Sequence, residues 1–132
     1  MVNVPDKVRT LLNDPDAVKV IATASKDGTP HAIVVGSGMS PAPDLVVAGE
    51  VMMKTTSANL KANPKVGVLV AKGPEAYLVV AENPKLVKEG EIYDKMNEEL
   101  SKMNLKARGV WMFTPSAVYD QSAGPNAGKK IA

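Results

Sequence analysis

The sequence has no cysteine and a single histidine among its 132 residues. A chain without cysteine cannot build a disulfide framework, a zinc site of the Cys/His type or a thiol nucleophile. The one histidine, His31, follows Pro30 at the start of an expected strand, and we expect it to be structural or to lie at the surface. No Gly-x-Ser-x-Gly elbow is present. The sequence therefore predicts no catalytic residue and no metal site, although oxygen ligands alone could still bind a cation.

Excess charge and long hydrophobic runs are also missing. The net charge is only +2, and no block of lysine and arginine is interleaved with aromatics as in single-strand binders. No apolar run is long enough to span a bilayer, and the first residues lack a basic segment followed by an apolar one. We therefore expect a soluble, cytoplasmic protein with no nucleic-acid partner and no membrane partner.

The chain has enough apolar residues for one domain. Its length can bury one core but hardly two, and the 45% hydrophobic content argues against disorder. No internal repeat or linker divides it. We predict a single domain over residues 1–121 and a C-terminal tail or arm over residues 122–132, where glycine, serine and asparagine are frequent.

The pattern of turns and apolar runs predicts a mainly β protein. A first helix runs from Pro5 to the stop at Asn13-Asp14-Pro15, and Asp27-Gly28 predicts a hairpin. Residues 36–43 read as a loop, and helices are expected over 56–62 and around Ile92 to Met103. The expected strands are 18–24, 31–35, 44–49, 65–71, 76–81 and 109–114, with a last edge segment at Val118-Tyr119. Short strands at regular spacing favour a closed or split barrel over a parallel α/β sheet.

One segment has the chemistry of a phosphate site. Residues 46–60 run from an apolar strand through Gly49 into a hydroxyl-rich helix start that carries Lys54. Free N–H groups and partial positive charge at a helix start attract anions, and Lys54 would add a full charge. Hydroxyls of Thr55, Thr56 and Ser57 could donate to the same anion. The same residues would also serve as an ordinary helix cap, so the segment alone leaves both interpretations open.

The order of the surrounding segments resembles a known family. The opening helix, the strand pair joined at Lys26-Asp27-Gly28-Thr29, the strand from Asp44 to Gly49, the hydroxyl-rich turn and Asn59-Leu60-Lys61-Ala62-Asn63-Pro64 are similar to the FMN-binding split-barrel proteins related to pyridoxamine 5'-phosphate oxidase. The resemblance covers roughly residues 5 to 121 and is most specific from Lys54 to Val66. It implies a six-stranded antiparallel split β-barrel with short flanking helices.

The resemblance also implies a set of cofactor contacts. The turn before the Asn-Leu helix would hold the phosphate of FMN, with either Lys54 or Thr56 in the position of the family's lysine. Ser37 would face the phosphate or ribityl chain, backbone groups would meet the edge of the ring, and Trp111 could stack on it. The implied contacts are Ser37, Gly49, Glu50, Val51, Lys54, Thr55, Thr56, Asn59 and Trp111.

A function is implied in the same way. The expectation is a homodimer with FMN between the subunits, acting as a small oxidoreductase or electron-transfer protein with an unknown redox partner. No arginine follows Arg108, so the arginine-rich substrate motif of the true oxidases is missing and we do not expect oxidation of vitamin B6. Two alternatives remain, a non-catalytic module that holds flavin or haem, and an interaction barrel without a cofactor.

Overall fold

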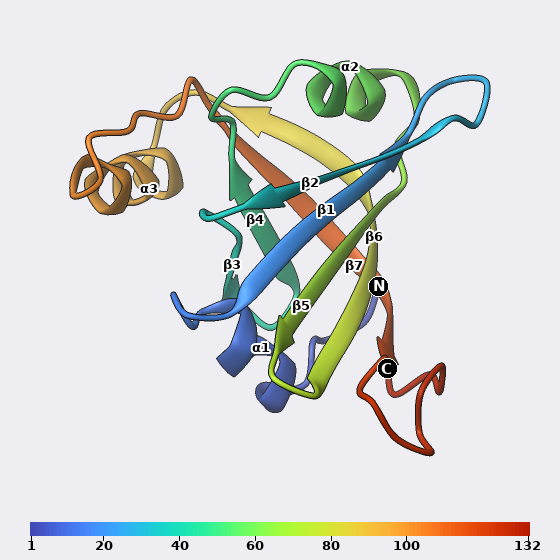
Figure 1. Ribbon diagram of the computed structural model, residues 1–132. Coiled ribbons are helices and arrows are strands. Elements are labelled where there is room, and N and C mark those ends of the chain that lie inside the picture. Colours follow the sequence, from blue (N-terminus) through green and yellow to red (C-terminus); the bar gives the residue numbers. More distant parts are fainter.

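The computed structural model describes residues 1–132 as one curled antiparallel sheet with three short helices (Figure 1). The seven strands follow the order β2-β1-β5-β6-β7-β4-β3 across the sheet. The elements are α1 (Asp6–Leu12), β1 (Val18–Ala24), β2 (Pro30–Val35), β3 (Met39–Ala42), β4 (Leu45–Gly49), α2 (Thr55–Ala62), β5 (Val66–Lys72), β6 (Glu75–Val87), α3 (Glu91–Ser101) and β7 (Val110–Asp120). This is the split barrel that the sequence predicts, with one strand more than expected.

The additional strand is β3, which lies in the segment that we expected to be a loop. Prolines and glycines surround it, but β3 is an edge strand, where a missing backbone donor is tolerated. Ser40 holds it in place: its hydroxyl lies 2.8 Å from the carbonyl oxygen of Leu45, and its N–H donates to Asn13 Oδ1 at 2.8 Å. The contact with Asn13 joins residues 27 positions apart in sequence, so the local pattern could not reveal it.

Strands β6 and β7 are longer than predicted. The sequence ends the first near Ala81 and divides the second at Pro115, whereas the structure continues both through irregular pairing. At the first irregularity Asn83 adopts a positive φ of 53°. At the second, Pro115 pairs with Ala81 next to a register shift. The segment at Val118-Tyr119 is therefore part of β7, a central strand between β6 and β4, and the prediction of a separate edge segment is wrong.

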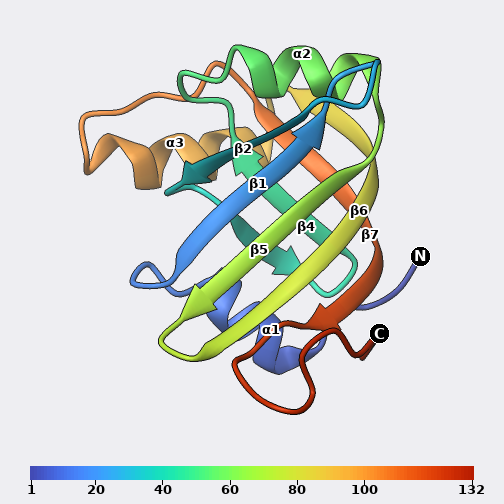
Figure 2. The ribbon, with the colours of Figure 1, turned by 45° about the vertical axis from the view of Figure 1, so that its right-hand side comes forward.

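The core is divided by the sheet. The larger cluster lies inside the barrel, where Val8 and Leu12 of α1 pack with inward side chains such as Phe113. The smaller cluster lies under α3 and joins Val47 to Met96. Strand β4 is therefore covered on both faces. Helices α1 and α2 lie at opposite ends of the barrel and α3 lies beside it (Figure 2).

Both ends of the chain contact β7. The N–H of Val2 donates to Pro115 O at 3.1 Å, and Ile131 N–H donates to Val118 O at 2.8 Å. Residues 121–132 turn back on their own chain, with Lys130 bridged to Tyr119. None of the three helices combines the length and apolar character needed to cross a membrane.

Candidate functional site

An apolar cleft lies beside the end of the edge strand β2. The end of β2 and the following turn form one side, residues 49–53 after β4 form the second, and the end of α3 with the loop after it forms the third. The cleft has a volume of about 380 Å³. Its lining residues are Ile33, Val34, Val35, Gly36, Ser37, Gly49, Val51, Met52, Met53, Leu100, Met103 and Leu105.

The cleft collects most of the exposed apolar side chains of the molecule. Six large hydrophobic residues are exposed in total, and two of these, Met1 and Val18, lie elsewhere. The other four line the cleft, with exposed fractions of 74% for Val34, 85% for Met52, 56% for Met103 and 37% for Leu105. A contiguous exposed apolar surface with a few polar groups indicates a binding site.

Ser37 connects the two sides of the opening between β2 and β4. Its hydroxyl oxygen accepts a hydrogen bond from the N–H of Gly49 at 3.1 Å, and both residues are buried. A Cβ atom on Gly49 would lie only 3.2 Å from that oxygen and 3.3 Å from Cγ of Met96. Glycine at this position therefore allows the strand to approach both neighbours closely.

Glu50 points away from the cleft into a buried polar network. Its carboxylate accepts a hydrogen bond from the Ser57 hydroxyl, and Arg108 Nε lies 3.7 Å from its other oxygen. The indole N–H of Trp111 donates to Ser57 Oγ at 3.2 Å. The backbone N–H of Glu50 also donates to the carbonyl oxygen of Gly109, and the N–H of Arg108 donates to the carbonyl oxygen of Glu50. This network attaches the start of α2 to β7, and it satisfies a carboxylate and an indole that would otherwise be costly to bury.

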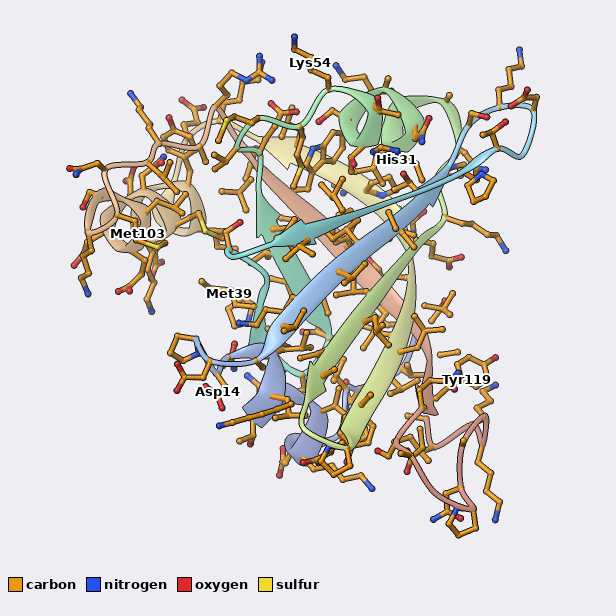
Figure 3. All side chains as sticks on the ribbon, in the orientation of Figure 1. Asp14, His31, Met39, Lys54, Met103 and Tyr119 are labelled. Carbon is orange, nitrogen blue, oxygen red and sulfur yellow. The ribbon has the colours of Figure 1, made fainter.

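The first two residues at the start of α2, Lys54 and Thr55, are exposed to solvent. Lys54 precedes the helix with no side-chain cap and extends away from the barrel (Figure 3). The first backbone N–H of the helix that pairs within it belongs to Ala58, which donates to Lys54 O at 3.0 Å. Thr55 is exposed, whereas Thr56 is buried and its hydroxyl has no hydrogen-bond partner. An anion could therefore reach Lys54, Thr55 and the first N–H groups of the helix.

Asn59 fulfils a structural role in the fold. Its side-chain amide donates to Thr23 Oγ1 at 3.1 Å, and both residues are buried. The contact attaches α2 to β1 across 36 positions of sequence. Asn59 therefore lies outside the cleft and outside the exposed helix start.

The structure thus separates the nine residues implied by the family resemblance. Ser37, Gly49 and Val51 line one cleft, and Lys54 and Thr55 follow directly in the chain after its wall. The other four residues are buried outside the cleft: Glu50, Thr56, Asn59 and Trp111.

Sequence reasoning missed most of the apolar wall of the cleft. Leu100 and Met103 are part of the helical repeat that predicts a buried face, so their position beside a cleft had no separate signal. Val34 looks like any other strand valine. Met52 and Met53 directly follow Val51 at the entrance to the hydroxyl-rich turn, and this position is the signal that could have found them.

Comparison with known proteins gives one family. A sequence model described as pyridoxamine 5'-phosphate oxidase matches residues 4–122. The uncharacterized protein MJ0282 of Methanocaldococcus jannaschii is 31% identical over 132 residues, covering 96% of this chain and 86% of that protein.

Solved structures show the same fold at low sequence identity. HupZ of Group A Streptococcus superimposes with a TM-score of 0.80 at 17% identity, over 95% of this chain and 99% of that one. An FMN-binding protein of Syntrophomonas wolfei gives a TM-score of 0.82 at 19% identity, over 90% of this chain and 86% of that one.

Proposed function

The chain belongs to the pyridoxamine 5'-phosphate oxidase family, and from this premise we propose that it is an FMN-binding redox protein. When bound, the flavin supplies the electron or hydride transfer, and the protein binds, orients and shields it. We propose no oxidation of vitamin B6, because no arginine follows Arg108.

The apolar cleft is the observation that carries this proposal. A flavin ring is planar and largely apolar on its faces, with polar atoms along its edges. The cleft offers matching chemistry, since apolar side chains such as Val34 and Met52 surround the polar Ser37–Gly49 contact. Its volume of about 380 Å³ falls in the range of small-molecule sites, about 300–1,000 Å³.

The phosphate of FMN is assigned to the start of α2. Residues 51–53 of the cleft wall lead directly to Lys54, so a ligand lying along this segment extends from the cleft to the exposed helix start. The buried hydroxyl of Thr56 is not available to such a ligand, whereas the ammonium of Lys54 is. This supports Lys54 over Thr56 as the residue that pairs with the phosphate.

A second copy of the chain is proposed to cover the flavin. The cleft is open, and its exposed rim residues Val34, Met52 and Met103 would remain in contact with water in a monomer. A symmetric homodimer would bury these side chains and the outer face of the ring together. Light scattering after gel filtration would measure the mass directly.

The test of this proposal compares two exposed valines. Val34→Asp places a charge in the cleft, whereas Val18→Asp places the same charge on the neighbouring strand, outside it. After addition of FMN and removal of the excess by gel filtration, we expect wild type and Val18→Asp to keep about one flavin per chain. Val34→Asp should lose it, because the carboxylate must be desolvated against the ring.

Three results would contradict the proposal. If Val34→Asp retains as much FMN as Val18→Asp, the cleft does not hold the ring. If wild type retains no FMN but shows a Soret band after addition of haemin, the cofactor is a haem. Absence of both signals would leave an interaction barrel without a cofactor.

A further inference from the structure

A second cavity adjoins the cleft on the side away from α2. It has a volume of about 360 Å³ and lies between the end of α1, the turn after β2 and α3. Gly36, Ser37, Leu100 and Met103 line both cavities. The two are therefore neighbouring parts of one groove, and Met39 and Met103 lie on this side of the molecule in Figure 3.

A buried lysine lines the second cavity. Lys19 is only 4% exposed, although it carries an ammonium group. That group has three N–H donors and makes a single hydrogen bond, to the backbone oxygen of Asp14 at 2.6 Å. Burial lowers the pKa of Lys19, and the carboxylates of Asp14 and Asp16 counteract this only in part. The ammonium is thus incompletely solvated by its own protein.

Unused backbone donors line the second cavity, and two of the three residues that carry them also line the cleft. None of the hydrogen bonds of the molecule uses the N–H groups of Gly36, Ser37 or Gly38. Ser37 and Gly38 are nevertheless buried. Buried backbone donors are almost always paired, so consecutive free ones indicate a position for an acceptor from outside the chain.

The charges around the cavity favour an anion. Lys95 lines it and makes no ion pair, whereas Glu99 is held by Lys102 at 3.3 Å. Asp14 is directed to Lys72, which lies 2.7 Å from its carboxylate. Two of the carboxylates near the cavity, those of Asp14 and Glu99, are therefore engaged by other lysines, and the carboxylate of Asp16 compensates the charge of Lys19 only in part.

We propose that this second cavity binds the anionic group, a carboxylate or a phosphate, of a small-molecule substrate whose remaining part lies against the flavin in the apolar cleft. Lys19 and the N–H groups of Ser37 and Gly38 bind the anion, and the shared wall sets the distance between the two groups. The proposal rests on the proposed function for the position of the flavin. The anion site itself is independent of whether flavin is bound.

The test uses inorganic phosphate as the ligand and backbone amides as the readout. Proton–nitrogen correlation spectra are recorded during titration of the apoprotein, with sodium chloride at matched ionic strength as the control. We expect saturable shifts of the Ser37 and Gly38 amides. Lys19→Met should weaken binding by about tenfold or more, because it removes a charge-assisted hydrogen bond, and Lys19→Arg should restore it in part. Lys65→Met, an exposed lysine before β5, should change nothing.

Three outcomes would overturn the proposal. In the first, wild type shows no saturable shift of these amides. In the second, Lys19→Met binds phosphate as tightly as wild type. In the third, phosphate displaces FMN from the loaded protein, and the cavity then holds the flavin's own phosphate. If Lys19→Met does not fold, Lys95→Ala replaces it, with severalfold weaker binding expected. Phosphate binding without any FMN retention would leave the anion site standing and remove the flavin proposal alone.

Discussion

Individual residues in this protein have roles that depend on which side of one turn they face. Ser37 and Gly49 open onto the cleft, whereas Glu50, the next residue, joins Ser57 and Arg108 in the interior. Lys54 then faces solvent at the helix start. Residues proposed to bind a ligand and residues that stabilise the fold are therefore adjacent in sequence. Substitutions at single positions can test the two roles separately.

Lys54 can be tested by comparing two flavins. Lys54→Ala should weaken FMN binding by about tenfold, because it removes a charge from the phosphate, a loss worth about 1.4 kcal/mol. Riboflavin, which has no phosphate, should bind wild type and variant equally. Fluorescence quenching titrations measure both affinities. Lys61→Ala, at the far end of the same helix, is the matched control, and an equal loss for riboflavin would show that the variant disturbs the cleft instead.

Ser57 should matter for stability, with little direct effect on the cleft. Ser57→Ala removes the hydroxyl that Glu50 and Trp111 share, leaving a buried carboxylate and a buried indole N–H short of a partner. We expect a loss of about 1–3 kcal/mol in the free energy of unfolding, measured by urea denaturation. Ser101→Ala, at an exposed hydroxyl of α3, should cost much less. Equal losses would mean that the network adds no stability.

The environment of Tyr77 predicts that the free energy of unfolding depends on pH in the alkaline range. Its phenol donates to Glu75 at 2.6 Å, and this bond with burial raises the pKa of Tyr77 from 10.0 to about 12. Folding therefore favours the protonated phenol, so its contribution is complete below pH 10 and is lost as the pH rises toward 12. The free energy of unfolding of wild type relative to Tyr77→Phe should fall across this window. A constant difference would contradict the assignment.

At the scale of secondary-structure elements, the edge strands and two helices determine where the cleft lies. The open edges β2 and β3 are joined by the turn that contains Ser37, while α2 and α3 approach from different sides. Turn chemistry and apolar runs were enough to predict most of these elements, because both signals are local. The lengths of β6 and β7 were mispredicted, since cross-strand pairing carries them through Asn83 and Pro115.

A substitution at Gly109 tests how closely the segment between α3 and β7 must approach β6. A Cβ atom here would lie 2.7 Å from Cδ1 of Leu86 and 3.0 Å from the backbone oxygen of Val87. Gly109→Ala should therefore destabilise the fold by about 1–3 kcal/mol, because a side chain and the backbone must both move. Thermal or urea unfolding measures the loss. Gly124→Ala, where a Cβ meets open space, should be neutral, and equal behaviour of the two variants would refute the close contact.

At the scale of the whole molecule, the position of the chain ends bears on the proposed dimer. Residues 122–132, the expected C-terminal tail or arm, fold back on β7 of their own chain. Val2 reaches the same strand from the other terminus. The apolar rim of the cleft therefore remains the surface proposed for the second copy.

Removal of residues 129–132 distinguishes a C-terminus that packs on its own chain from one that contacts a second copy of the chain. The deletion removes four backbone hydrogen bonds to β7, three with Val118 and one with Asp120. At about 0.5–1.5 kcal/mol net for each bond, the melting temperature should fall clearly. The mass from light scattering should stay that of the wild type. A change from dimer to monomer with an unchanged melting temperature would instead place the segment across the partner.

The sequence by itself determined the fold class, the approximate positions of most helices and strands, and the exclusion of cysteine-based chemistry. These follow from composition, periodicity and turn residues, which act over a few positions of the chain. Only the tertiary structure decided which residues of the 49–57 turn face the cleft, that Trp111 is held by Ser57, and that Leu100 and Met103 complete the apolar wall. The direction of each side chain there depends on pairing and hydrogen bonding between segments far apart in sequence, and no local pattern encodes that.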